Sequence, residues 1–272
     1  METIIKIKNL TYDYNQRKHA LRGINLNIYK GQKLAVIGSN GAGKSTFFLN
    51  INGVLKSDCG EIYYRDELIT RRKLNQLRKN VGIVFQDADQ QIIASTVMQE
   101  VSFGPMNLKL PREEVIQRVE QALAYMNISE YKDRPPHYLS GGEKKRVSIA
   151  DIIAMKSEVI IFDEPTAGLD PYNTDMLEEV LVKLGHEGKT LLISTHDMNF
   201  VYRWADRAIV FCNGQIIADG TPLEVFRNEE VLKRASLKRP TLLDVYDMLI
   251  EKKKLCQSDV YPKTTEELYA LL

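Results

Sequence analysis

The sequence predicts an α/β fold with a mostly parallel core sheet. Two continuous apolar runs, at 34–37 and 159–162, and a third predicted strand at 190–194 with an apolar centre have the length and composition of strands buried on both faces. Amphipathic helical patterns separate these runs, and buried strands that alternate with helices indicate a parallel sheet. A chain of 272 residues, 44% of them hydrophobic, is long enough for one large domain with an appendage.

The first thirty residues predict an antiparallel sheet that leads into the parallel core. Apolar and polar residues alternate over 5–14 and again over 21–28, which is the pattern of half-buried strands. The polar stretch 15–19 between them predicts a turn. Further on, 81–85 predicts a short strand, and the basic stretch 71–79 predicts a solvated helix or loop face.

Residues from about 88 to 155 have a helical character. Pro111 opens one helix with a single apolar face, and Ser140 precedes a second helix. The positions of the first helix that we expect in the core are Val115, Val119, Ala122, Leu123 and Met126. After the last apolar run, the turn residues Asn213-Gly214 between two apolar stretches predict a hairpin.

The end of the chain predicts a small helical appendage. Capping-box spacing at Thr241 and at Thr264 predicts that two helices start there. The predicted organisation is a main domain over 1–228, with a helical subdomain at about 88–155, and a C-terminal helical extension over 229–272 as a candidate dimer-forming element.

A glycine-rich stretch after the first apolar run carries the clearest chemistry. It places four residues between a glycine and Gly-Lys-Ser, which is the pattern of a phosphate-binding loop. Its glycines let successive backbone N–H groups point into one concavity, and the next helix adds the positive end of its dipole. Lys44 is expected to reach the β- and γ-phosphates, and the Ser45 hydroxyl to bind Mg²⁺. The predicted phosphate-binding residues are Gly38, Ser39, Asn40, Gly41, Ala42, Gly43, Lys44, Ser45 and Thr46.

Polar side chains follow the ends of three other predicted strands. Asp163 is expected to hold Mg²⁺ through water, and Glu164 to orient or deprotonate the attacking water. Gln86 is a candidate to bind Mg²⁺ or its waters, and His196 to contact the γ-phosphate. Polar exits from strands are common, so these residues gain their meaning from the phosphate loop that accompanies them.

A second anion cradle lies at Ser140, Gly141 and Gly142, at the start of a predicted helix. One chain does not need two cradles for one triphosphate. Two chains that face each other head to tail do need them, because the second cradle of each completes the site of the other. The sequence therefore predicts a dimer.

Composition excludes several other classes of protein. The net charge of +1 produces no global field that favours nucleic acid or an anionic membrane. The three cysteines, Cys59, Cys212 and Cys256, lack the spacing of a disulfide scaffold or a zinc site. The N-terminus has no signal-peptide pattern, and no run of 18 apolar residues occurs. We expect a soluble chain that reaches a membrane only through a partner.

These motifs, in this order, resemble the ATP-binding subunit of an ABC transporter over roughly residues 3–226. The resemblance implies a P-loop NTPase fold of ABC type, with an antiparallel β subdomain and a helical signature-motif subdomain. It implies catalytic roles for Glu164, His196, Gln86 and Lys44. It places Walker A at 38–46, the Q-loop at Gln86, the signature at 139–143, Walker B at 159–164, the D-loop at 168–170 with Asp170 as a nucleotide-binding residue, and the switch histidine at His196. Tyr14 matches the aromatic position that stacks on adenine, with Tyr12 as its rival.

Finer features resemble the energy-coupling factor ATPases. Residues 86–92 and 101–108 are similar to their Q-loop extension and its next segment, and 139–150 and 242–246 look closest to the cobalt-type, CbiO-like members. Two residues depart from the pattern. They are Ala88, where proline is frequent, and Glu143, where glutamine is the general choice.

The resemblance implies an ATP-hydrolysing subunit of an importer, with ATP and Mg²⁺ as cofactors. It implies a second ABC ATPase subunit, identical or a similar paralogue, an integral membrane subunit that docks near Gln86–Ile92, and a substrate-binding membrane subunit. No nucleic-acid partner is expected. The chain would lie at the cytoplasmic face of the cell membrane. Cobalt is the expected cargo, and nickel or a vitamin remains an alternative.

Two other functions stay open from the sequence. A soluble ABC ATPase of DNA repair or translation usually carries a long coiled-coil insertion or two fused cassettes, and neither pattern occurs here. A non-hydrolysing regulatory subunit is disfavoured because both Glu164 and His196 are present.

Overall fold

A computed structural model describes residues 1–14, 18–255 and 260–272. Most of the predicted polar turn at 15–19, and Cys256, lie outside the described residues. The strands are β1 (Thr3–Tyr14), β2 (Lys18–Tyr29), β3 (Lys33–Gly38), β4 (Cys59–Tyr64), β5 (Glu67–Leu68), β6 (Val81–Val84), β7 (Val159–Asp163), β8 (Thr190–Ser194), β9 (Arg207–Cys212) and β10 (Gln215–Gly220). The helices are α1 (Lys44–Ile51), α2 (Leu74–Asn80), α3 (Val97–Asn107), α4 (Arg112–Tyr125), α5 (Gly141–Ala154), α6 (Pro171–His186), α7 (Met198–Trp204), α8 (Pro222–Arg227), α9 (Glu229–Ala235), α10 (Thr241–Glu251) and α11 (Thr265–Tyr269).

The core sheet has six strands in the order β10-β9-β3-β8-β7-β6, and every neighbouring pair except β9–β10 is parallel. Alternate residues of β3 enter different cores: Leu34 and Val36 pack on one face of the sheet, Ala35 and Ile37 on the other. Burial of both faces explains why these strands are continuous apolar runs. The predicted mostly parallel core sheet is confirmed.

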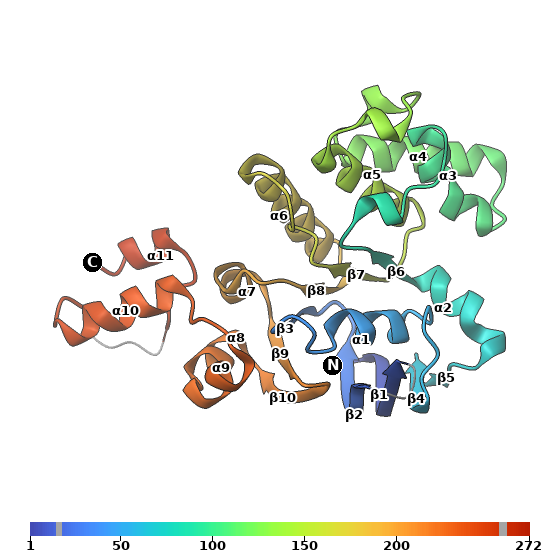
Figure 1. Cartoon of the computed structure of the whole chain (residues 1–272). Coiled ribbons are helices and arrows are strands. Elements are labelled where there is room, and N and C mark those ends of the chain that lie inside the picture. The colour runs from blue at the N-terminus through green and yellow to red at the C-terminus, as the bar shows by residue number, and fades with distance from the viewer. Residues whose placement is uncertain (15–17, 256–259) are drawn as a thin grey trace.

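A second, antiparallel sheet has the strand order β2-β1-β4-β5. It shares a core with α1 and one face of the central sheet, where Phe47 and Phe48 of α1 are fully buried. In Figure 1 this sheet lies below α1. The predicted antiparallel β subdomain is confirmed.

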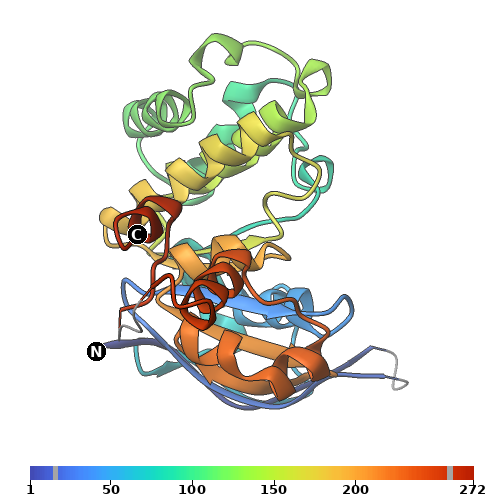
Figure 2. The same cartoon turned by 90° about the vertical axis from the view of Figure 1, so that its left-hand side faces the viewer.

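Helices α3, α4 and α5 form a separate lobe above the sheets (Figures 1 and 2). The five predicted core positions of α4 and its C-terminus are all buried, as are Val147 and Ile149 of α5. The long segment between β6 and β7 therefore shares a hydrophobic core with one face of the central sheet.

The C-terminal helices lie on the opposite side of the molecule from this lobe (Figure 1). The predicted helix start at Thr264 is confirmed, since its hydroxyl accepts a hydrogen bond from the Glu267 N–H at 3.2 Å. The predicted capping box at Thr241 is wrong. Pro240 is the N-cap of α10, with φ −60° and no side-chain cap bond, and Thr241 is the first helical residue. The Thr241 N–H instead donates to Asn199 Oδ1 at 2.8 Å, so a tertiary contact replaces the local cap.

None of the helices within the described ranges is long and apolar enough to cross a membrane.

Candidate functional site

The phosphate loop connects β3 to α1, where the predicted strand, turn and helix follow one another. Lys44, the first residue of α1, is 5% exposed, and its Nζ donates to the carbonyl oxygens of Gly38 at 2.9 Å and Ser39 at 3.2 Å. Burial lowers the pKa of Lys44, and the nearby carboxylates of Glu164 and Asp163 oppose this effect. The ammonium is thus held inside the curl of the loop.

Backbone packing explains the last glycine of the loop. Gly43 has φ +111°, and a Cβ there would lie 2.6 Å from the Ala20 carbonyl oxygen. The turn between β9 and β10 supports the loop as well, because the Gly214 N–H donates to the Ala42 carbonyl at 2.9 Å. The loop is therefore clamped between β2 and the β9–β10 hairpin.

Glu164 is the centre of a polar cluster at the mouth of this loop. Its Oε1 lies 2.9 Å from His196 Nε2 and 3.6 Å from Lys44 Nζ, and its Oε2 lies 3.5 Å from Gln86 Nε2. Gln86, Glu164 and His196 follow β6, β7 and β8, which are adjacent parallel strands. Parallel strands end at one edge of a sheet, so the topology brings together three side chains that are far apart in the sequence.

Ser194 holds the two acidic residues in place, and sequence reasoning missed it. Glu164 has φ +45°, a left-handed conformation that is rare for a residue with a side chain. Its N–H donates to Ser194 Oγ at 2.8 Å, and Ser194 Oγ donates to Asp163 Oδ1 at 2.6 Å. The hydroxyl at the buried end of a predicted strand was the only available signal.

A cavity of about 650 Å³ surrounds these groups. Of the predicted site residues, its lining includes Tyr14, the loop over 39–46, Gln86, Glu164 and His196. Lining residues that were not predicted are His19, Ala20, Arg22, Asn213 and Gly214. Gly38 and Asp163 do not line the cavity, but Gly38 accepts a hydrogen bond from the lining residue Lys44, and Asp163 directly precedes the lining residue Glu164.

The two tyrosines that compete for the adenine-stacking role differ in position. Tyr14 lines the cavity, is 45% exposed, and has its hydroxyl 3.4 Å from Thr46 Oγ1. Tyr12 does not line it and packs edge-on against Tyr14, with ring centroids 4.9 Å apart. The geometry favours Tyr14 as the aromatic platform.

Residues at this edge suit Mg²⁺. Ser45, Gln86 and Asp163 offer a hydroxyl, an amide and a carboxylate oxygen, which are hard donors. One oxygen of the buried Asp163 is oriented by Ser194, and the exposed Ser45 lines the cavity. Mg²⁺ is generally bound by one or two protein oxygens together with phosphates and water, and this donor set fits that habit.

The other predicted nucleotide-binding residues lie elsewhere in the chain. Ser140 caps α5: its Oγ accepts from the Glu143 N–H at 3.3 Å, and Glu143 Oε2 accepts from the Ser140 N–H at 2.7 Å. Asp170 caps α6 by accepting from the Asn173 N–H at 2.8 Å. Ser140, Gly141, Gly142 and Asp170 do not line the cavity of their own chain. Glutamine would also suit a capping box, so Glu143 preserves this local structure.

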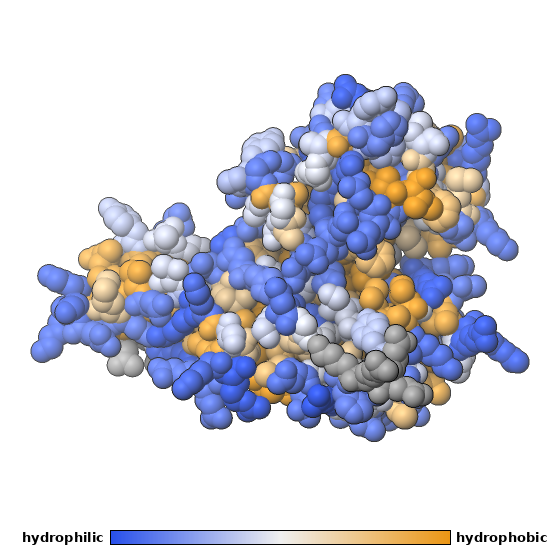
Figure 3. Space-filling model, viewed as in Figure 1, coloured by the Kyte–Doolittle hydropathy of each residue, from blue (hydrophilic) through white to orange (hydrophobic). Residues whose placement is uncertain are grey.

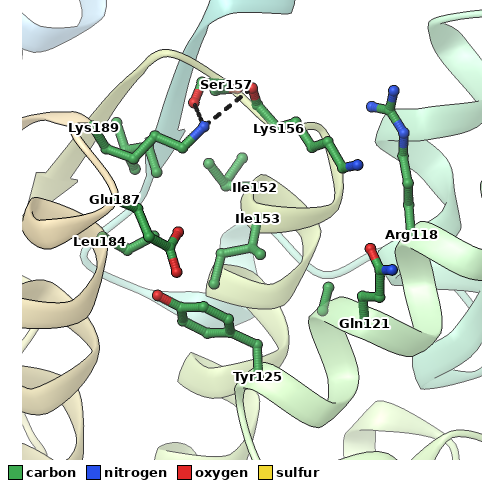
Figure 4. A pocket seen from close by; sticks show the side chains of 12 residues that line it. Arg118, Gln121, Tyr125, Ile152, Ile153, Lys156, Ser157, Leu184, Glu187 and Lys189 are labelled. Atoms are coloured by element: carbon green, nitrogen blue, oxygen red, sulfur yellow. Dashed lines mark hydrogen bonds between the residues drawn. The ribbon is translucent and has the colours of Figure 1, made fainter.

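A second cavity, of about 270 Å³, lies between α4, α5 and α6 (Figure 4). Lys189 Nζ donates there to the carbonyl oxygens of Lys156 and Ser157. The Tyr125 hydroxyl points toward Glu187 in Figure 4, and burial together with that carboxylate raises the pKa of Tyr125. None of the predicted site residues lines this cavity, which lies at the joint between the helical lobe and the core.

Comparisons with known proteins agree with this geometry. The sequence profile of the ABC transporter family matches residues 21–167. The energy-coupling factor transporter ATP-binding protein EcfA of Methanothermobacter thermautotrophicus is 47% identical over 90% of this chain and 80% of its own length. A putative ABC transporter ATP-binding protein of Methanosarcina mazei is 45% identical over 97% of this chain and 59% of its own length. The energy-coupling factor transporter ATP-binding protein EcfA2 of Methanospirillum hungatei is 48% identical over 90% of this chain and 62% of its own length.

Solved structures give the same family. The structure of cbiO1 from Clostridium perfringens, described as part of the ABC transporter complex cbiONQ, has a TM-score of 0.76 and 42% identity, covering 92% of this chain and all of that one. A dimeric ATP-binding cassette in a post-hydrolysis state, bound to ADP and phosphate, has a TM-score of 0.72 and 29% identity over 80% of this chain and 99% of its own. The chain therefore belongs to the ABC transporter family, among the energy-coupling factor ATP-binding proteins, and it is an ATPase.

Proposed function

We propose that this chain is one of two ATPase subunits that drive an energy-coupling factor importer, with cobalt as the transported ion. The observation that carries the catalytic part is the meeting of Lys44, His196 and Gln86 on one carboxylate, Glu164, at the mouth of the phosphate loop.

In this proposal Lys44 and the N–H groups of the loop bind the phosphates of ATP. Glu164 accepts a proton from the attacking water, and His196 holds the carboxylate and the γ-phosphate in register. Ser45, Asp163 and Gln86 would hold Mg²⁺, which neutralises charge on the β- and γ-phosphates. An incoming phosphate competes with Glu164 for the Lys44 ammonium, so binding frees the carboxylate for water.

The proposed second subunit supplies the other half of each site. Ser140, Gly141 and Gly142 begin α5 at the surface, and a Cβ on Gly141 would meet nothing within 4 Å. This open helix start suits an approach by the phosphates of a neighbouring subunit. The similar cassette with ADP and phosphate is dimeric, which supports the arrangement.

The proposed membrane contact lies beside Gln86–Ile92. The exposed apolar side chains Ile93, Phe103 and Met106 lie close to it in the chain, and the last two share one face of α3. Figure 3 shows hydrophobic surface over this part of the helical lobe. A docked membrane subunit would cover these side chains and hold the ATPase at the cytoplasmic face of the membrane.

The C-terminal extension over 229–272 is proposed to contribute to the dimer. Met248, Tyr269 and Leu272 expose apolar surface near its end, where Figure 3 also shows hydrophobic colour. Its first helix, α9, packs into the main core through Val231 and Leu232, so the extension is anchored before it projects.

The catalytic proposal is tested by Glu164→Gln. We expect kcat to fall at least about 100-fold, because the proton acceptor is lost, while ATP binding is retained. Glu179→Gln, on the exposed side of α6, is the matched control and should hydrolyse ATP at the normal rate. Near-normal hydrolysis by Glu164→Gln would exclude this residue as the base.

The cargo is tested on the complete transporter in proteoliposomes. Cobalt as the cargo rests on the resemblance of 139–150 and 242–246 to cobalt-type ATPases, and on the similarity to cbiO1. ATP-dependent accumulation of Co²⁺, measured by mass spectrometry, is expected. Accumulation of Ni²⁺ or a vitamin instead would reassign the cargo, and failure to co-purify with an integral membrane protein would contradict the transport role.

A further inference from the structure

Lys145 is a buried lysine of α5 that contacts the Q-loop rather than solvent. It is 3% exposed, and its Nζ donates to the carbonyl oxygens of Phe85 at 2.9 Å and Gln86 at 2.6 Å. These carbonyls belong to the two residues that follow β6. Burial of an ammonium costs free energy unless its N–H groups are hydrogen-bonded. The two carbonyl oxygens at the end of β6 provide these hydrogen bonds.

Weaker ties join the same two segments on either side. Lys144 Nζ pairs with Asp89 Oδ1 at 2.6 Å. Gln91 donates to the Ser148 carbonyl of α5 at 3.1 Å. Within its own segment, its side chain also accepts from the Phe85 N–H at 3.2 Å. Helix α5 thus holds the Q-loop from its first residue to Gln91, and the same helix begins at the signature residue Ser140.

We propose that Lys145 is a positioning residue for ATP hydrolysis, which fixes the Gln86 backbone to α5 and so makes the Gln86 side chain follow that helix. When α5 moves its N-terminus onto the nucleotide of a second subunit, Gln86 shifts against Glu164 in its own site. Lys145 itself contacts neither the nucleotide nor the reacting atoms. This inference rests on the proposed roles of Gln86 and Glu164.

The first test compares Lys145→Met with its neighbour Lys144→Met in the full-length protein. We expect kcat of Lys145→Met to fall about tenfold, for the loss of two charge-assisted hydrogen bonds, with KM for ATP nearly unchanged. The Lys144–Asp89 pair is partly exposed. Exposed ion pairs contribute little, so kcat of Lys144→Met should stay within about twofold of wild type. Normal kcat in Lys145→Met, or a rise in its KM that matches the fall in kcat, would overturn the proposal.

The second test separates positioning from general stabilisation. If Lys145 acts through Gln86, then Lys145→Met added to Gln86→Ala should lower kcat no further, whereas independent effects would multiply. Multiplying losses would overturn the proposal. Failure of the proposed function is seen separately, as ATP hydrolysis that persists in Glu164→Gln.

The third test uses a conservative variant. Arginine keeps a cationic donor at this position, so Lys145→Arg should retain more of the wild-type kcat than Lys145→Met does. A kcat of Lys145→Arg as low as that of Lys145→Met would overturn the proposal.

Discussion

The phosphate loop and the signature segment are both glycine-containing turns at the start of a helix, but they differ in how strongly contacts within the chain constrain them. In the phosphate loop, Gly43 has a left-handed φ and a close backbone neighbour, and Lys44 is bound inside the curl. In the signature segment, Ser140 and Glu143 form a reciprocal capping box, and Gly141 faces open space, while Gly142 packs against the Asn173 side chain. One cradle is shaped by its own chain, while the other is a capped helix start that awaits a second chain.

This difference separates what folding fixes from what assembly adds. A residue such as Gly43 is constrained by the monomer, so its replacement should disturb folding and binding together. A residue such as Gly141 is unconstrained in the monomer, so its replacement should be felt only when two chains meet.

The largest effect is expected from Gly43→Ala. Its Cβ would lie 2.6 Å from the Ala20 carbonyl oxygen at φ +111°, so the loop must move. ATP affinity should fall about 100-fold, corresponding to about 3 kcal/mol, and the melting temperature should drop. Gly141→Ala is the matched control, and it should keep its ATP affinity and gain up to about 1 kcal/mol of stability. Titration with a fluorescent ATP analogue and thermal unfolding measure both, and equal losses in the two variants would erase the distinction.

Complementation tests the division of the site between chains. Lys44→Met removes the cradle of one chain and Gly141→Arg blocks the other segment, so each variant alone should hydrolyse almost no ATP. A one-to-one mixture forms heterodimers with one intact composite site, and hydrolysis should recover to about a quarter of the wild-type rate. The steady-state ATPase rate of the mixture is the measurement. A mixture as inactive as its parts would argue that the two cradles do not share a nucleotide.

A smaller effect is expected at the aromatic edge of the complete cradle. Tyr14→Ala should weaken ATP binding by about 1–3 kcal/mol, the range for loss of a base stacked on an aromatic ring. Tyr12→Ala should weaken it less, because Tyr12 contacts Tyr14 rather than the cavity. Calorimetric titration with ATP ranks the two. A larger loss in Tyr12→Ala would transfer the stacking role to that residue.

The smallest effect concerns the cap of the signature helix. The Ser140 backbone N–H lowers the pKa of Glu143. A carboxyl whose pKa is depressed by folding adds stability above its unfolded pKa, and this stability is lost as pH falls through the folded pKa. Glu143→Gln keeps the capping box, so at neutral pH the free energy of unfolding should change by less than about 0.5 kcal/mol. Between pH 7 and pH 4, the melting temperature of Glu143→Gln should drop less than that of the wild type. An equal drop in both proteins would show that Glu143 does not contribute to the loss of stability in acid.

Much of the central sheet and the phosphate loop could be predicted because the information is local. Strands such as 34–37 and 159–162 are apolar throughout, since both of their faces are buried. The loop depends on consecutive residues, and the meeting of Gln86, Glu164 and His196 follows from parallel strands ending at one edge.

Contacts between distant residues could not be predicted in this way. Lys145 donates a hydrogen bond to a carbonyl oxygen 60 positions earlier in the chain. Ser194 donates to Asp163 on the neighbouring strand, and Gly214 in the β9–β10 turn donates to the phosphate loop. Thr241 was misjudged for a related reason. Its spacing fits a cap, but the tertiary bond to Asn199 and the extended Pro240 before it set the helix start instead.

The resting contact between Glu164 and Lys44, at 3.6 Å, means that the protein carries a tethered competitor for its own substrate. A molecule in which the carboxylate contacts the ammonium is not competent to bind ATP. The apparent dissociation constant of ATP is the intrinsic constant divided by the competent fraction, so this contact raises it. A neutral side chain at position 164 relieves that competition before any chemistry is blocked. Tight ATP binding in Glu164→Gln would thus have two sources: ATP that is bound but not hydrolysed, and the loss of the carboxylate that competes for Lys44. ADP is not hydrolysed by either protein, so a change in ADP affinity reports the loss of the competing carboxylate alone.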